Sequence, residues 1–206
     1  MKVIATWDDA AIEDLKLAEL MAKYEIPTIF YWPFNLEKSV NVKSIKKFLT
    51  QKQCLEIAKK FEIGSHTITH NYLTKIPLKA ASPEISDSRK KWQDLTGQGI
   101  NSLCYPRGYS NQLIRMIAKN AGYKNARTTV VGRLDEGTDP YQTPTTVHVG
   151  IDRVEYKGIC WQMFANKMLE EARKKDDAIF HLFGHSWEIE RENDWKDLES
   201  LLKELK

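Results

Sequence analysis

Apolar and polar residues alternate along this chain in a way that predicts short buried strands separated by amphipathic helices. Short apolar runs, many with β-branched or aromatic residues, occupy 2–7, 28–32, 62–64, 101–105 and 178–183. Further strands are expected within 123–131 and within 145–149. Each run is too short for a helix and is bounded by turn residues, which favours strands.

Between these strands, apolar residues three and four positions apart mark helical faces. Leu17, Leu20, Met21 and Tyr24 form one such face, on a helix expected from about Ile12. Thr50 and Gln53 indicate a capping box, Ser82-Pro83-Glu84 a helix start, and Ser110 the cap of a helix that ends near Gly122. Helices are also expected over 158–174 and from Trp195 to Leu205.

The alternation of strand and helix predicts an α/β fold with parallel strands and helical crossovers. Roughly seven such units in 206 residues favour a small (β/α) barrel over an open doubly wound sheet, which remains the alternative. No Gly-x-Gly-x-x-Gly follows the first strand, so a dinucleotide-binding sheet is disfavoured. No linker or repeat divides the chain, and residues 1–206 are interpreted as one domain.

Composition narrows the function by exclusion. With 31 Lys+Arg against 28 Asp+Glu and no basic block, the sequence gives no reason to expect a nucleic-acid partner. A hydrophobic content of 42% excludes a disordered chain, and no apolar run is long enough to span a bilayer. No signal peptide is evident, so the chain as written is expected to be cytoplasmic, or extracellular if a signal was trimmed. The three cysteines suggest neither a disulfide framework nor a Cys-x-x-Cys site, and the oligomeric state stays open.

Polar residues gather where the predicted strands end. Asp8-Asp9 follow the first strand, His66 and His70 the third, Tyr105-Pro106-Arg107-Gly108 the fourth and His185 the last. In a barrel of parallel strands these ends meet on one face, where the active site lies. The sequence therefore predicts a single site assembled from several strands.

Each of these motifs also has a simpler interpretation. Asp8-Asp9 is typical of a helix N-terminal turn, His66 and His70 of surface or capping residues, and Tyr105 to Gly108 of a tight turn. In the functional interpretation, one turn of helix places His66 and His70 on the same face. Together with Asp9 they would form a set of two imidazoles and a carboxylate that suits catalytic zinc or a similar divalent ion.

The remaining histidines differ in their positions along the predicted strands. His185 lies beyond the last strand and is the better candidate for a proton donor. His181 lies within that strand and is more typical of a structural residue, and His148, between two valines, suggests a strand role.

The ordered set Thr6-Trp7-Asp8-Asp9, Ser65-His66 to His70, Tyr105-Pro106-Arg107-Gly108 and Phe183-Gly184-His185 resembles the polysaccharide deacetylases of carbohydrate esterase family four, also called the nodulation-deacetylase homology domain. The resemblance covers roughly residues 2–190. It implies a distorted (β/α) barrel, often seven-stranded, and metal-dependent hydrolysis of acetyl groups from N-acetylated or, less often, O-acetylated sugars. It further implies that Asp8 is the general base, that Asp9, His66 and His70 hold the metal, and that His185 is the general acid, with His181 as the competing match.

The third motif departs from the family pattern, in which an arginine before the proline orients the catalytic aspartate. Here Tyr105 precedes Pro106 and Arg107 follows it, which resembles a variant of poly-N-acetylglucosamine deacetylases. Our hypothesis is that Arg127, on the next predicted strand, supplies the guanidinium. The Asp/Trp-containing motif of the family is not clear, and Asp135, Asp139 and Asp152 all remain candidates for it.

In the implied mechanism, Asp8 takes a proton from water on one divalent ion, zinc or else cobalt, nickel or manganese. A main-chain N–H, of Tyr105 or a neighbour, holds the oxyanion, and His185 protonates the leaving amine. Substrate contacts are expected from Tyr105, Pro106, Arg107 and Trp187, and Trp32 and Tyr109 are further candidates for stacking on sugar rings or for packing.

Three functions stay in competition: a sugar deacetylase, a metal amidohydrolase of small non-sugar amides, and a noncatalytic glycan-binding relative. The acidic and histidine motifs disfavour the third. The first two differ in loops such as 33–42 and 132–144, which the motifs do not describe.

Overall fold

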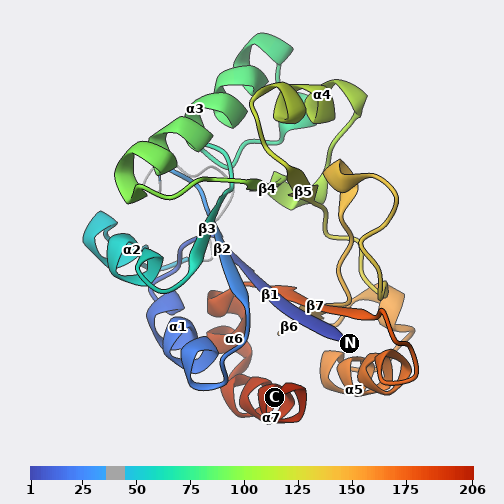
Figure 1. The fold of residues 1–206 in the computed structure, drawn as a ribbon. Helices are drawn as coiled ribbons and strands as arrows, with labels where there is room; N and C mark the ends of the chain where they lie inside the picture. Colours follow the sequence, from blue (N-terminus) through green and yellow to red (C-terminus); the bar gives the residue numbers. More distant parts are fainter. Residues whose placement is uncertain (36–44) are drawn as a thin grey trace.

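The computed structural model describes residues 1–35 and 45–206, and its centre is a seven-stranded sheet (Figure 1). The strands are β1 (Lys2–Asp8), β2 (Thr28–Trp32), β3 (Glu62–Ser65), β4 (Ser102–Cys104), β5 (Asn125–Arg127), β6 (Val147–Val149) and β7 (Ile179–Gly184). They lie in the order β5-β4-β3-β2-β1-β7-β6, and every neighbouring pair is parallel. The predicted parallel α/β architecture is confirmed.

The sheet curls into a distorted barrel. Its helices lie on the outside of the curl, whereas an open doubly wound sheet would carry them on both faces (Figure 1). The segment 143–146 leads directly into the edge strand β6 and also bonds to the other edge strand, β5: Thr128 N–H donates to the Thr143 carbonyl at 2.9 Å, and Thr143 N–H to the Ala126 carbonyl at 3.0 Å. The barrel interpretation therefore holds, and the open sheet does not.

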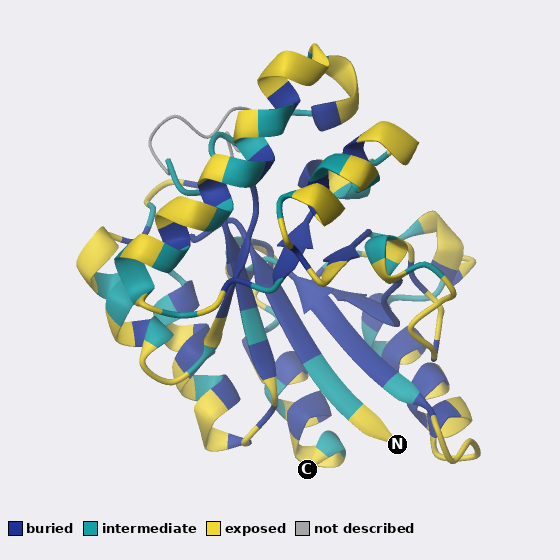
Figure 2. Ribbon diagram, turned by 45° about the horizontal axis from the view of Figure 1, so that its top comes forward, coloured by how far each residue is buried: buried dark blue, intermediate teal, exposed yellow. Residues whose placement is uncertain are grey.

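The helices pack against the outer face of the curled sheet. They are α1 (Asp14–Lys23), α2 (Gln51–Ala58), α3 (Leu78–Thr96), α4 (Gln112–Asn120), α5 (Trp161–Ala172), α6 (Ser186–Glu192) and α7 (Trp195–Leu205). Figure 2 shows buried strands at the centre and helices whose inner faces are buried and outer faces exposed. The predicted capping box of Thr50 and Gln53 is present at α2, and Gly97, with φ of 72°, ends α3.

The expected helix start at Ser82 was wrong. Helix α3 begins at Leu78, after the extended Pro77, and Pro83 lies inside it. Leu78 to Ala81 are good helix formers, and Ala81 is fully buried, so packing extends the helix by one turn. A proline this close to the start removes only one internal hydrogen bond.

Two other boundaries differ from the sequence pattern. The cap of α4 is Asn111, whose Oδ1 accepts from Ile114 N–H at 3.0 Å, and not Ser110. Asparagine caps as well as serine does, and the local pattern could not separate the two neighbours. The short helix α6, directly after β7, was not predicted at all.

Core packing concentrates aromatic side chains around β2. Phe30, Trp32 and Trp92 form a chain of ring contacts with centroids 5.3 and 5.9 Å apart. Full burial of one such side chain contributes about 1.5–3 kcal/mol. β2 lies between β1 and β3, so this packing supports the two strands whose ends carry the first two site motifs.

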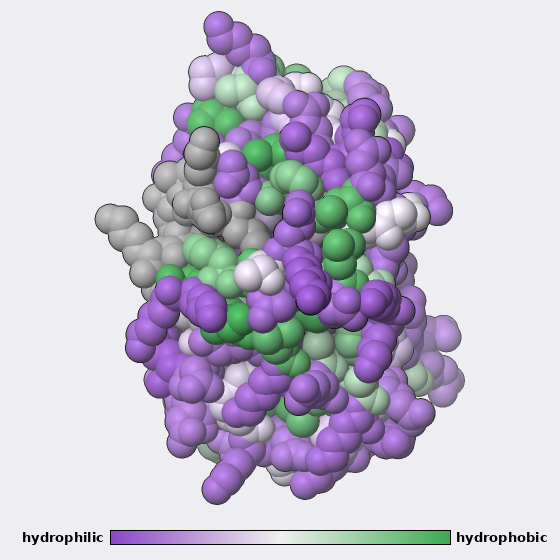
Figure 3. Space-filling view, turned by 90° about the vertical axis from the view of Figure 1, so that its left-hand side faces the viewer, coloured by the Kyte–Doolittle hydropathy of each residue, from purple (hydrophilic) through white to green (hydrophobic). Residues whose placement is uncertain are grey.

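The side of the molecule that carries α1, α2 and α3 is mostly hydrophilic, with smaller hydrophobic areas between charged side chains (Figure 3). Among the described residues, none of the helices combines the length and hydropathy needed to cross a bilayer. Of the two loops expected to govern substrate choice, 132–144 is described, whereas 36–42 of the loop 33–42 lies outside the described residues.

Candidate active site

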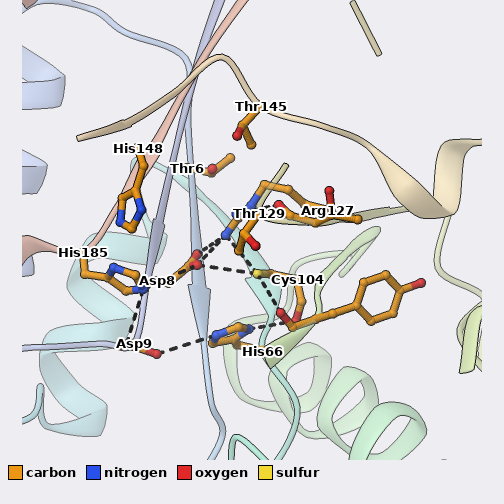
Figure 4. A network of polar contacts seen from close by, with 12 residues as sticks. Thr6, Asp8, Asp9, His66, Cys104, Arg127, Thr129, Thr145, His148 and His185 are labelled. Atoms are coloured by element: carbon orange, nitrogen blue, oxygen red, sulfur yellow. Dashed lines mark hydrogen bonds and ion pairs between the residues drawn. The ribbon is translucent and has the colours of Figure 1, made fainter. Parts of the chain in front are cut away.

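A cavity of about 420 Å³ opens where β1, β3, β4 and β7 end. Its lining contains residues from each of the ordered motifs and several that the sequence did not single out: Asp8, Asp9, His66, His70, Tyr72, Tyr105, Arg107, Tyr109, Thr129, His148, Arg153, Phe183, His185, Trp187 and Glu188. Figure 4 shows how the polar side chains at its floor face one another.

Asp8 and Asp9 face the same cavity although they are adjacent in sequence. Alternation along a strand would point them to opposite sides of the sheet. Asp8 ends β1, and Asp9 adopts a φ of 82°, which breaks the alternation. Left-handed backbone at residues other than glycine carries strain that is typical of functional sites. Both side chains are buried.

His66 and His70 come together through a loop and not through a turn of helix, so that part of the expectation was wrong. Thr67 and His70 both adopt positive φ, of 69° and 56°. The Glu84 carboxylate, on α3, accepts from the N–H groups of Ile68 and Thr69 at 2.9 Å each and holds this loop. The two imidazole rings lie 4.6 Å apart.

Asp9, His66 and His70 present one donor atom each toward a common point. Asp9 Oδ1 lies 3.6 Å from His66 Nε2 and 3.5 Å from His70 Nε2. Ligands about 2.0–2.1 Å from a tetrahedral ion are roughly 3.4 Å apart, so these spacings suit a divalent cation. Asp9 Oδ1 is buried and has no hydrogen-bond partner among the described residues, which is costly unless a ligand binds it. The residues present therefore fit a metal ion.

The tautomer of His66 also suits a metal ligand. Its Nδ1 lies 2.8 Å from the Cys104 carbonyl oxygen, which can only accept. Nδ1 therefore carries the proton, and the lone pair of Nε2 faces Asp9. Burial and the neighbouring His70 lower the pKa of His66 to about 4, so the ring is neutral at pH 7.

Arg127 lies beside Asp8. Its Nη2 donates to Asp8 Oδ1 at 2.5 Å and also contacts Oδ2, and the guanidinium is almost fully buried (Figure 4). Burial raises the pKa of Asp8, but Arg127, His66 and His185 more than offset it and bring the pKa to about 2. The carboxylate is therefore ionised at neutral pH.

Arg127→Ala is expected to destabilise the fold by about 3–5 kcal/mol, because it leaves the buried charge of Asp8 unpaired. It should also raise the pKa of Asp8. With a pKa below the usual 3.8, ionised Asp8 stabilises the protein above that pH, and this contribution is lost as the pH falls toward 2. Because Asp8 must be ionised to accept a proton, a higher pKa of Asp8 in the variant should move the acid limb of the pH–rate profile to higher pH. Chemical denaturation and a pH–rate profile measure both effects, and full activity with an unshifted profile would contradict the orienting role of Arg127.

His185 and His181 occupy different cavities. His185 lines the cavity at the strand ends, with Nε2 3.6 Å from Asp9 Oδ2 and 3.9 Å from Asp8 Oδ2. His181 lines a second cavity of about 370 Å³ in the barrel interior, where its Nε2 lies 3.0 Å from Thr6 Oγ1. His181 therefore does not line the cavity that contains Asp9, His66 and His70.

Glu188 is the carboxylate beside His185, with Oε2 2.6 Å from Nδ1. Burial lowers the pKa of His185, but Glu188, Asp9 and Asp8 raise it to about 10. The three candidates for the Asp/Trp-containing motif make other contacts: Asp135 pairs with Arg133, Asp139 accepts from Tyr141 N–H, and Asp152 accepts from Trp161 N–H. Glu188 could have been found from the sequence, because it lies three residues after His185, at the start of a helix.

The start of α6 is fixed by a buried carboxyl group that the sequence analysis missed. Asp14 accepts from Ser186 Oγ at 2.5 Å and from Trp32 Nε1 at 2.8 Å. Burial raises the pKa of Asp14 to about 8. Trp32 is consequently a core residue and does not line the cavity.

Of the residues expected to contact the substrate, some line the cavity with accessible side chains and others are buried in the core. Arg107 and Trp187 line the cavity, and Trp187 Nε1 donates to Asp9 Oδ2 at 3.4 Å. Tyr105 lines it but is fully buried, so its ring face is closed to sugar stacking. Pro106, in the 3₁₀ turn Pro106–Gly108, is buried and is not among the lining residues.

The main-chain N–H of Tyr105 is not available for an oxyanion. It donates to the Arg127 carbonyl at 3.3 Å in the ladder between β4 and β5. An aromatic rim does exist nearby, because Tyr72 and the exposed Tyr109 stack with centroids 6.2 Å apart.

The floor of the cavity combines an ionised carboxylate, three donor atoms that could hold a metal ion, and a histidine held by a second carboxylate. Such a site can activate water, polarise a carbonyl group and protonate a leaving group. These are the elements of hydrolysis of an amide or ester.

Comparisons with known proteins indicate the family and the fold to which this chain is similar. A family model for polysaccharide deacetylases matches residues 1–126. YxkH of Bacillus subtilis (strain 168), whose name assigns it provisionally to the polysaccharide deacetylases, is 29% identical over 132 residues, covering 63% of this chain and 45% of YxkH. The chain thus spans less than half of that relative.

Solved structures share the fold. The Streptococcus pyogenes deacetylase PplD in complex with acetate gives a TM-score of 0.61 at 22% identity, covering 68% of this chain and 62% of PplD. The family 4 carbohydrate esterase from Streptomyces lividans in complex with acetate gives a TM-score of 0.61 at 11% identity, covering 98% of this chain and 88% of the esterase.

Proposed function

This chain belongs to the polysaccharide deacetylase family, and from that membership we propose that it is a metal-dependent hydrolase that removes acetyl groups from N-acetylated sugars. The bond cleaved is a carbon–nitrogen bond other than a peptide bond, and the substrate is an acetylated glycan or oligosaccharide. One observation supports this most: Asp8, the donors around Asp9, and His185 face a single cavity. The acetate in the PplD and Streptomyces lividans structures, the product of such a reaction, agrees with it.

Asp9, His66 and His70 would hold one divalent ion. Two imidazoles and one carboxylate are typical of catalytic zinc, and the same set accepts cobalt, nickel or manganese. When bound, the ion would supply Lewis-acid polarisation of the acetyl carbonyl and would make water more acidic.

Asp8 and His185 divide the proton transfers. Asp8 takes a proton from the attacking water, and Arg127 keeps its carboxylate ionised and oriented. His185 donates the proton on Nε2 to the departing amine nitrogen, while Glu188 accepts from Nδ1–H and fixes the ring. An ester-linked acetyl group, as in O-acetylated sugars, would need this proton less, because an alkoxide leaves more easily than an amide anion.

The walls of the cavity would bind the sugar. Arg107, from the third motif, and Trp187, from the segment after β7, both line the cavity. The stacked pair Tyr72–Tyr109 offers an exposed aromatic surface for a neighbouring sugar unit. No oxyanion donor is assigned to the main chain.

Acetate release tests the proposal against its alternatives. We expect the metal-loaded protein to release acetate from N-acetylglucosamine oligomers, and chelation to stop it. Turnover of small non-sugar amides without release from any oligomer would favour the amidohydrolase instead. Binding of oligomers without turnover of either class would favour the noncatalytic relative.

A further inference from the structure

Glu188 accepts hydrogen bonds from two histidines at the same oxygen. His185 Nδ1 lies 2.6 Å from Oε2, and His148 Nε2 lies 2.9 Å from it. Figure 4 shows His148 beside His185, on the side away from Asp9. We propose that His148 is a positioning residue, which holds Glu188 where that carboxylate orients the proton donor His185. The inference rests on the proposed function, and it replaces the strand role expected from the sequence.

His148 is itself held on three sides. It lies on β6, and its ring stacks on Phe183 with centroids 4.3 Å apart and planes at 28°. Its main-chain N–H donates to the Tyr156 hydroxyl at 2.7 Å. A ring packed in this way keeps one orientation, so it can fix the carboxylate that it contacts.

Arg153 sets the tautomer of His148. Its Nη1 lies 3.5 Å from His148 Nδ1, and because a guanidinium only donates, Nδ1 must accept. The ring proton is therefore on Nε2, which donates to Glu188. Burial lowers the pKa of His148, against the opposing effect of Glu188, so the ring is neutral. Arg153 is fixed in turn by Glu155, with contacts of 2.8 and 3.2 Å.

A metal ion at this cluster is the competing explanation, since donor atoms of His148, His185 and Glu188 lie close together. The two spacings of 2.6 and 2.9 Å are hydrogen-bond lengths. They are shorter than the roughly 3.4 Å between two ligands of a tetrahedral ion. The spacings around Asp9, 3.5 and 3.6 Å, do suit an ion. The cluster is therefore a hydrogen-bonded chain.

Two variants separate positioning from packing. His148→Phe keeps a ring over Phe183 but has no N–H for Glu188, and His148→Gln keeps a donor near the position of Nε2. Each is assayed on an N-acetylglucosamine oligomer and on 4-nitrophenyl acetate, whose leaving group departs without a proton. We expect His148→Phe to lose about 10- to 100-fold in kcat on the oligomer, with KM and aryl-ester hydrolysis little changed, and His148→Gln to recover most of the loss.

The outcomes that overturn the proposal are distinct. Equal losses on both substrates would show a general structural role, and two metal equivalents in the wild type, falling to one in His148→Phe, would show a second metal site. A wild-type protein that hydrolyses neither substrate would overturn the proposed function, and this inference with it.

A measurement on the wild-type protein avoids the question of whether the variants fold. In ¹⁵N NMR spectra of the histidine side chains, His148 should be the neutral tautomer protonated at Nε2. Protonation at Nδ1 alone would refute the proposal.

Discussion

Asp8→Asn is expected to abolish turnover while the protein keeps its metal. Asparagine has nearly the shape of aspartate but cannot accept a proton from water, and loss of a general base costs about 100- to 10,000-fold in kcat. Asp8 contacts Arg127 and is not one of the three donors grouped around Asp9 Oδ1. The measurements are kcat on an N-acetylglucosamine oligomer and metal content by elemental analysis.

Folding of this variant needs a control, because Arg127 would lose its charged partner. A thermal unfolding curve in the presence of metal shows whether the variant is folded at the assay temperature. A folded Asp8→Asn protein that deacetylates at the wild-type rate would contradict the assignment of Asp8 as base. One that has lost its metal would contradict the division of roles between Asp8 and Asp9.

His66→Ala is expected to remove both the metal and the activity. It deletes one of two imidazole donors, and alanine offers no replacement. Metal bound only to the folded state stabilises it by about 2.7 kcal/mol at a concentration one hundred times Kd. The wild type should therefore gain in unfolding temperature when zinc is added, whereas His66→Ala should gain nothing.

His181→Gln is the matched control. It also removes a buried imidazole, but His181 lines the interior cavity and contacts Thr6. It should keep the metal and the zinc-dependent stabilisation. Retention of stoichiometric metal by His66→Ala would refute its role as a ligand, and loss of metal in both variants would point to general destabilisation.

Local patterns predicted the strands well because buried strands are short apolar runs with clear ends. Residues 28–32 were placed at the limits of β2, and the capping box of Thr50 and Gln53 was found because both partners lie within one turn. Boundaries failed where two neighbours could serve equally, as with Ser110 and Asn111, or where tertiary packing of Ala81 extended α3 past a favourable cap.

The site residues at the strand ends could be predicted from the sequence, because parallel strands bring their carboxyl ends together at one edge of the sheet. How these residues are oriented relative to one another could not be predicted from the sequence. Sequence spacing suggested a helix for His66 and His70, whereas positive φ at Thr67 and His70 forms a loop. The partnership of Glu188 with His148 spans 40 residues and depends on the register of β6 with β7, which no local pattern reveals.

The central position of β1, between β2 and β7, has a consequence for the growing chain. Its neighbour on one side, β2, follows within about 20 residues, but β7 arrives only at Ile179–Gly184. At 5–20 residues per second, ribosomal synthesis leaves that edge of β1 unpaired for roughly 10 to 35 s. An exposed apolar strand edge invites pairing with other chains, so the nascent protein is expected to depend on chaperone binding until β7 has docked.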